Sequence, residues 1–217
     1  MVVQIPVKRI DVPPGQHVLL HGVSWQEFEA ILEDLGDHRG SRLAYDKGVL
    51  EITMPLPEHE YDKEIVGDLL KALLEELDIE FLTLGSTTFK DPDLQQGLEP
   101  DQCFYIQNEA RVRGKKRLDL AIDPPPDLAL EIDVTSRTHP DLYQALKVPE
   151  LWCFDRGVLL IAVLRDGKYV EVSESPIFPG LPLIEAIPQY LAHSKTAGRN
   201  ATLKAFRHWV RGDAKRT

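Results

Sequence analysis

Pro126-Asp127-Leu128-Ala129-Leu130-Glu131-Ile132-Asp133-Val134 is the stretch that decides the fold of this 217-residue chain. It is a short, β-prone run with an acid in its middle, a pattern typical of a buried strand. A similar run, Asp101 to Gln107, begins thirty residues before Glu131 and follows Pro100. Because burying an isolated carboxylate is costly, acids in such strands usually have a partner, most simply a shared hard cation. The pair therefore indicates a metal-dependent hydrolase.

The alternation of side chains along a strand places Glu131 and Asp133 on the same side. If Asp101 begins an adjacent strand, three carboxylates converge, enough to hold Mg²⁺ or Mn²⁺ with water and a backbone carbonyl. Such a cation can lower the pKa of a bound water and stabilise charge on a phosphate, so phosphodiester cleavage is the predicted reaction. Taken alone, either Asp101 or Glu131 would more often be a solvated or salt-bridged surface group.

The rest of the chain supplies helices and further strands. Ser24 and Glu27 form a predicted capping box that begins a helix ending near Gly36. Apolar residues spaced by three and four predict a long amphipathic helix between Glu58 and Asp78. The remaining expected elements are a hairpin (42–45 and 49–54), strands (81–84, 87–89, 101–107, 128–134, 151–154, 158–164 and 169–172), a polar loop (91–97) and short helices (141–147, 184–193 and 202–210). A mixed α/β fold follows, with a mixed β-sheet flanked by helices.

The composition, 43% hydrophobic and 28% charged, is that of a globular protein. No apolar run is long enough to span a bilayer, so no membrane partner is expected. The N-terminus lacks the apolar region and cleavage site of an export signal. Cys103 and Cys153 are read as two reduced core thiols rather than a disulfide, and a reducing cytoplasm fits best.

The net charge of −10 argues against nonspecific coating of nucleic acid, because that affinity comes from Lys and Arg. The charge is uneven, however. Residues 195–217 hold seven cations against one anion, and a second basic cluster occupies 111–117. Either segment could contact phosphate. The alternatives are a solvated or frayed helix end for 195–217 and an exposed hairpin loop for 111–117.

Longer phrases resemble a known family. They are Gly48-Val49-Leu50-Glu51-Ile52, Pro55-Leu56-Pro57-Glu58-His59-Glu60-Tyr61, Glu99-Pro100-Asp101, Pro125-Pro126-Asp127-Leu128-Ala129-Leu130-Glu131 and Val148-Pro149-Glu150-Leu151-Trp152. In this order they are similar to the Uma-two family of predicted restriction endonucleases, within the PD-(D/E)XK nuclease superfamily. The resemblance implies a restriction-endonuclease-like fold, DNA as substrate, frequent homodimers, and Asp101 and Glu131 as divalent-metal ligands. It also places a nuclease domain at 23–190, between an N-terminal extension (1–22) and a basic C-terminal helical tail (191–217).

The sequence departs from the superfamily pattern beside the second acid. Asp133 stands where a lysine, two residues after Glu131, would orient and help deprotonate the attacking water. We favour Asp133 as an additional metal ligand, and the cations available to replace the lysine are Lys115, Arg137 and Lys147.

Two further groups come from the start of the long helix. His59 is a candidate catalytic residue, as a proton shuttle, phosphate contact or partner of the metal; the alternative is an exposed histidine. Glu60 or Glu64 could supply the acid that many of these nucleases carry on their first helix, although acids at this position more often serve a favourable interaction with the helix dipole.

Three functions remain open from the sequence. The favoured one is a Mg²⁺- or Mn²⁺-dependent DNA endonuclease. The second is a catalytically inactive nuclease fold that binds nucleic acid or protein, which the missing lysine and the acidic body support. The third is another enzyme with paired carboxylates, such as a glycoside hydrolase that needs no metal.

Overall fold

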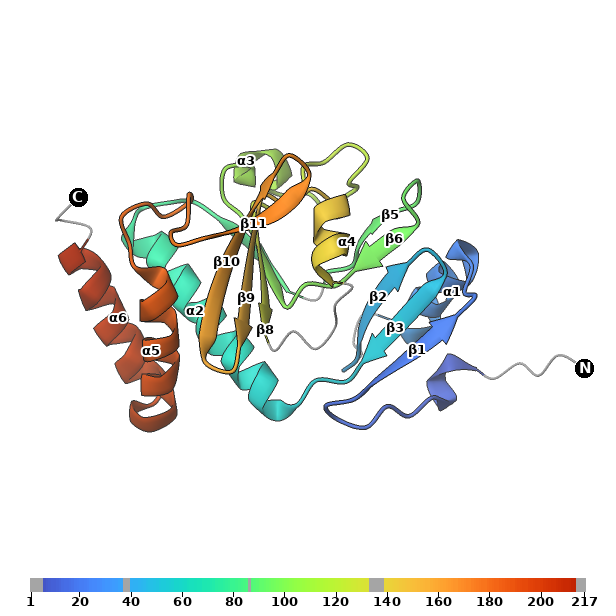
Figure 1. Cartoon of the computed structure of the whole chain (residues 1–217), viewed down its shortest axis with the longest axis horizontal. Helices are drawn as coiled ribbons and strands as arrows, with labels where there is room; N and C mark the ends of the chain where they lie inside the picture. The colour runs from blue at the N-terminus through green and yellow to red at the C-terminus, as the bar shows by residue number, and fades with distance from the viewer. Residues whose placement is uncertain (1–5, 37–39, 86, 133–138, 214–217) are drawn as a thin grey trace, which may run out of the picture.

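The computed structural model describes residues 6–36, 40–85, 87–132 and 139–213, which form two β-sheets and their covering helices (Figure 1). The first sheet is antiparallel and has the order β1-β3-β2-β6-β5: His17–His21 (β1), Val49–Thr53 (β3), Arg42–Asp46 (β2), Gln96–Leu98 (β6) and Phe89–Asp91 (β5). The second has the order β11-β10-β9-β8-β7-β4: Lys168–Val172 (β11), Val158–Arg165 (β10), Glu150–Asp155 (β9), Leu128–Ile132 (β8), Gln102–Tyr105 (β7) and Leu82–Leu84 (β4). Only the β8–β9 pairing within these described strands is parallel.

Most of the helices lie beside the second sheet, whereas α1 packs against the first. They are Trp25–Leu35 (α1), Pro57–Glu76 (α2), Glu109–Val112 (α3), His139–Ala145 (α4), Leu183–Ala197 (α5) and Arg199–Asp213 (α6), with a 3-10 turn at Val7–Arg9 (η1). Figure 1 shows α2, α5 and α6 grouped against one face of this sheet, and α4 between the two sheets. The predicted mixed α/β fold with flanking helices is confirmed, although the strands form two sheets where one was expected.

Local sequence signals explain several of these elements. The capping box of α1 forms as predicted: the Glu27 N–H donates to Ser24 Oγ (3.3 Å), and the Ser24 N–H donates to Glu27 Oε2 (2.8 Å). The predicted hairpin is β2–β3, whose turn has positive φ at Lys47 (43°) and Gly48 (96°). Pro57 occupies the first turn of α2, where its missing N–H is not needed.

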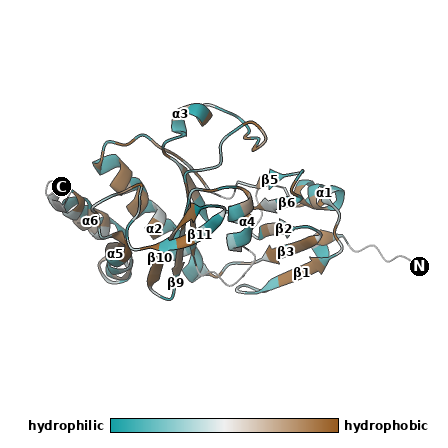
Figure 2. Ribbon diagram, turned by 45° about the horizontal axis from the view of Figure 1, so that its top comes forward, coloured by the Kyte–Doolittle hydropathy of each residue, from teal (hydrophilic) through white to brown (hydrophobic). Residues whose placement is uncertain are grey.

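The apolar stripe of α2 is buried against the second sheet, as its spacing predicts. Its members are Ile65, Val66, Leu69, Leu70, Leu73 and Leu74, packed with strand residues such as Leu130 and Trp152 in the largest core (Figure 2). Helix and sheet approach closely at Gly67, where a Cβ atom would lie 2.1 Å from Gln102 Oε1. This close contact places the middle of α2 beside the first residue of β7, which directly follows Asp101.

The described part of the basic C-terminal segment, residues 195–213, belongs to the folded helical layer. Phe206 and Val210 are buried in the core beside α2. Four of its cations form ion pairs with carboxylates of α2: Lys195 with Glu58 and Asp62, Arg199 with Asp68, Arg207 with Glu75 and Glu76, and Arg211 with Glu76. These charges are neutralised within the chain, which removes much of the argument for a phosphate-contacting patch here.

Two other segments can be compared with their expected structure. The predicted polar loop 91–97 holds parts of a short hairpin, β5–β6, because β6 extends the first sheet by pairing with β2. The basic cluster 111–117 lies in the connection between the antiparallel strands β7 and β8 and its cations are exposed, as the alternative of an exposed hairpin loop expects. This connection also contains the short helix α3, and two of its cations are paired, Arg113 with Glu109 and Lys115 with Asp123. Tertiary pairing decided the outcome for β6, since this three-residue strand carries no periodic signal of its own.

Both thiols, Cys103 and Cys153, are free, as predicted. None of the helices in the described part of the chain has the length and hydrophobicity needed to cross a membrane.

Candidate active site

Asp101 directly precedes β7, and Glu131 lies in the neighbouring strand β8 of the second sheet. The strand predicted to begin at Asp101 begins one residue later, at Gln102. Strands β7 and β8 are antiparallel, with Gln102 opposite Leu130, so one further step of the same register brings Asp101 opposite Glu131. Residues directly opposite in an antiparallel pair share a face, with Cβ atoms about 4.5–5.5 Å apart. A hydrogen bond from the Ile132 N–H to Asp101 Oδ2 (2.7 Å) closes this end of the pairing. The expected convergence of Asp101 and Glu131 therefore agrees with the register.

Both acids face α4 and are buried. Asp101 is 1% exposed and Glu131 is 6% exposed. They share their face with Cys103 and Ala129, which pack against α4, while the alternate residues face α2. From α4, the Tyr143 hydroxyl donates to Glu131 Oε1. Burial first, and then the charge of Glu131, raise the pKa of Tyr143 well above its usual value, so this hydroxyl remains a donor.

Asp101 belongs to a ring of four polar side chains, each in contact with the next. Arg42, from β2 of the first sheet, contacts Asp101 Oδ1 with Nη1, and its Nη2 lies 3.2 Å from Glu60 Oε1. His59, from the first turn of α2, completes the ring: its Nδ1 is 3.4 Å from Glu60 Oε1 and its Nε2 is 3.2 Å from Asp101 Oδ2. Lys63 also contacts Glu60. The hydrogen bond with His59, aided by Lys63 and Arg42, lowers the pKa of Glu60 to about 2.

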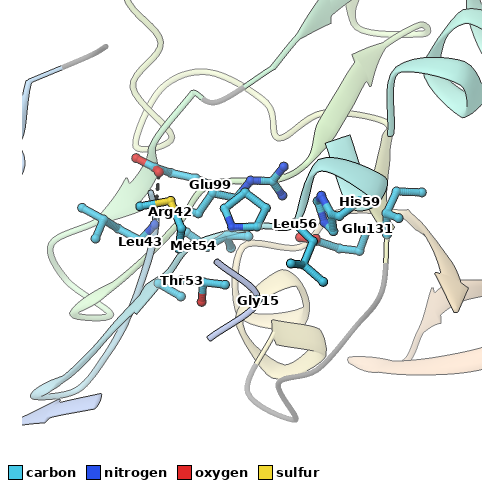
Figure 3. Close-up of a pocket in the computed structure, with 13 residues that line it drawn as sticks. Gly15, Arg42, Leu43, Thr53, Met54, Leu56, His59, Glu99 and Glu131 are labelled. Carbon is cyan, nitrogen blue, oxygen red and sulfur yellow. Dashed lines mark hydrogen bonds between the residues drawn. The ribbon is translucent and has the colours of Figure 1, made fainter. Parts of the chain in front are cut away.

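This ring opens onto a pocket between the two sheets. Figure 3 shows Arg42, His59 and Glu131 lining it from three different elements, β2, α2 and β8. Two more cavities, of about 400 and 390 Å³, share lining residues with it: one continues past His59 toward Arg156 and Lys195, and the other past Arg42 toward Pro14. The central pocket, of about 90 Å³, is the smallest of the three, and it adjoins the other two through these shared residues.

The remaining sequence candidates have different positions. Asp133 and Arg137 lie outside the described residues. Lys115 is paired with Asp123 and Lys147 is exposed, and neither lines the pocket. Of the two helix acids, Glu60 belongs to the ring, whereas the Glu64 side chain is 63% exposed.

The donor chemistry of the site fits a hard divalent cation, because two buried carboxylates share one face of adjacent strands. Within residues 6–36, 40–85, 87–132 and 139–213, no three His, Cys, Asp or Glu side chains are grouped closely enough to hold an ion. Asp101 and Glu131 therefore supply two candidate ligands, and the third predicted ligand, Asp133, belongs to the undescribed segment.

Sequence reasoning missed two residues of this site, Arg42 and Tyr143. Arg42 is the first residue of β2, and Tyr143 is in a short helix, where a tyrosine usually means core packing. The only local signal was strand alternation, which places Arg42 on the face of β2 opposite the buried Leu43. Their roles depend on contacts with residues far away in the chain.

Comparisons with known proteins identify the family and the fold. The sequence profile of the Uma2 family, described as "Putative restriction endonuclease", matches residues 25–190. Among solved structures, the chain is similar to a "putative nuclease belonging to DUF820" from Anabaena variabilis, with a TM-score of 0.52 and 12% sequence identity over 87% of this chain and 99% of that one. At this identity the likeness concerns the fold alone. No protein of curated function matches the chain significantly.

Proposed function

The chain belongs to the Uma2 family, and on that premise we propose that it hydrolyses DNA phosphodiester bonds at the pocket between its two sheets, with Mg²⁺ or Mn²⁺ as cofactor. The observation that carries the proposal is the placement of two buried carboxylates, Asp101 just before β7 and Glu131 in β8, opposite each other by register, with Glu131 on the wall of this pocket. Acids this deeply buried need a function or a partner.

Asp101 and Glu131 would hold the divalent metal, with Asp133 as the third carboxylate. When bound, the metal would lower the pKa of a water molecule attached to it and stabilise negative charge on the phosphate. Tyr143 orients Glu131 through its hydroxyl, and the Ile132 N–H orients Asp101. A carboxylate that is already held by a hydrogen bond loses less conformational freedom when it binds a metal.

His59 lies where it can hold or move a proton at Nε2, beside Asp101 and on the wall of the pocket. Its Nδ1 lies 3.4 Å from Glu60 Oε1, so a carboxylate oxygen is near each ring nitrogen. This arrangement supports His59 as the proton-carrying residue proposed for the reaction.

The two cavities that adjoin the central pocket support the proposal of a polymeric substrate. A single DNA strand crossing the central pocket would continue into the cavities on either side of it, past His59 and past Arg42. We propose a cytoplasmic homodimer as the working form, since two sites related by symmetry suit cleavage of both strands. Light scattering coupled to size-exclusion chromatography tests the dimer.

One observation favours a second function. Asp133 replaces the lysine expected two residues after Glu131, so a fold that binds nucleic acid without cutting it is the competing proposal.

The test compares the wild-type protein with Asp101→Asn and Glu131→Gln, which keep side-chain size but remove the charge. Supercoiled plasmid is incubated with each protein in Mg²⁺, in Mn²⁺ and in EDTA. We expect nicking or linearisation by the wild type only with metal, and loss of at least a hundredfold in rate for both variants. Glu29→Gln, an exposed carboxylate paired with Lys90 away from the pocket, is the matched control. Metal-dependent DNA binding without any cleavage would favour the binding module.

A further inference from the structure

Protein groups already occupy both oxygens of Asp101. Arg42 Nη1 contacts Oδ1, while Oδ2 accepts the Ile132 N–H and lies 3.2 Å from His59 Nε2. The Asp101 side chain is fully buried, and that of Arg42 is 15% exposed. A divalent ion that uses Asp101 as a ligand therefore meets a guanidinium at one of its two oxygens.

Two cations at one carboxylate oxygen repel each other strongly in a site shielded from water. The Arg42 side chain has space to move away from Asp101, because it lines both the central pocket and the neighbouring cavity near Pro14. It is also the one Lys or Arg among the described residues that line the central pocket. A guanidinium presents paired N–H groups that match two phosphate oxygens, and it is always charged.

We propose that Arg42 is a displaceable counter-ion of Asp101 that becomes the phosphate-binding residue of the site when a divalent ion binds. The inference rests on the proposed function and adds to it a source for the positive charge that the missing lysine would have provided. It differs from the sequence expectation, in which Lys115, Arg137 or Lys147 would supply that charge.

The first measurement is the affinity for Mn²⁺ without DNA, by isothermal titration calorimetry. Arg42→Met removes the competing charge while keeping much of the side-chain length, so we expect it to bind Mn²⁺ roughly tenfold more tightly than wild type. Arg42→Lys keeps the charge and should stay within about threefold of wild type. Arg113→Met, which breaks an ion pair with Glu109 outside the pocket, is the matched control and should bind as wild type does. Arg42→Gln is the second neutral variant if Arg42→Met does not fold.

The second measurement is the binding of a short mixed-sequence DNA duplex as a function of salt, in Ca²⁺ and in EDTA. In Ca²⁺, Arg42→Met should weaken binding and reduce the slope of log K against log salt by about one, as expected for one lost phosphate contact. In EDTA, where Arg42 is held by Asp101, wild type and variant should have the same slope.

The outcomes separate this inference from the function on which it rests. If Asp101→Asn lowers Mn²⁺ affinity but Arg42→Met leaves it unchanged or lowers it, the counter-ion role is wrong and the metal site stands. If Mn²⁺ binds more tightly but the slope in Ca²⁺ is unchanged, the phosphate role is wrong. If Asp101→Asn binds Mn²⁺ as tightly as wild type, the proposed metal site fails and the inference fails with it.

Discussion

Tyr143→Phe tests whether the hydroxyl of α4 holds the buried carboxylate of Glu131. The substitution removes a single oxygen from a side chain that is 1% exposed, and it leaves Glu131, 6% exposed, without this donor. A hydrogen bond to a charged group contributes about 1.5–3 kcal/mol, so we expect the free energy of unfolding to fall by about 2 kcal/mol. For a chain of this size, that corresponds to a melting temperature lower by about 4–8 °C.

Tyr45→Phe is the matched control. Tyr45 is equally buried, but its hydroxyl donates to a neutral acceptor, the Val23 carbonyl, at 2.8 Å. A neutral hydrogen bond contributes about 1 kcal/mol, so this variant should lose about half as much stability. Urea unfolding followed by tryptophan fluorescence measures both. If Tyr143→Phe costs no more than Tyr45→Phe, the charged hydrogen bond is not contributing as we infer.

The pH dependence gives an independent check on the same contact. Burial and the Glu131 charge raise the pKa of Tyr143 in the folded protein, whereas the unfolded chain releases this proton near pH 10. The stabilisation from this tyrosine is therefore fully present below pH 10 and is lost as the pH rises above it. The stability difference between wild type and Tyr143→Phe should narrow between pH 7 and about pH 10.5. A difference that stays constant would contradict the assignment.

Three further predictions concern the rest of the fold. Phe206→Ala should destabilise the whole chain by about 3–5 kcal/mol in urea unfolding, because this α6 side chain is 0% exposed and packs against Tyr190; a loss below 1 kcal/mol would mean that α6 unfolds separately. Glu76→Gln should speed amide exchange throughout α6, because it removes the carboxylate that pairs with Arg211 and Arg207. These two arginines, Arg211 more than Arg207, lower the pKa of Glu76 to about 2. In the wild type the ion pairs therefore stabilise the fold above pH 4.5, and this stabilisation is lost as the pH falls toward 2. Native protein should resist iodoacetamide, since burial raises the pKa of both free thiols to about 12, and mass spectrometry should find alkylation only after unfolding.

The sequence predicts those parts of the fold that depend on neighbouring residues. The capping box sets the start of α1, the apolar spacing sets α2, and the Asp46-Lys47-Gly48 turn sets the β2–β3 hairpin. Each of these signals works through residues a few positions apart, so it is visible in a single chain. The family phrases also identified the fold class and the two acids that the register later places opposite each other.

The division into two sheets could not be predicted in this way. The hairpin β2–β3 has the same local pattern whether it joins the sheet of the acids or forms another, and β6 is too short to show a period of its own. Only the pairing of β6 with β2 places the first sheet across the pocket from Glu131.

The residues of the candidate site show the same difference between what local sequence determines and what tertiary contacts determine. Local sequence determined that Glu131 occupies a strand and that Asp101 stands at the start of another, because alternation and β propensity act over a few residues. The tertiary structure alone decided that Arg42, fifty-nine positions before Asp101, is its counter-ion and that Tyr143 binds Glu131. These contacts join segments from different layers, and they contribute to stability only when packing removes both partners from water.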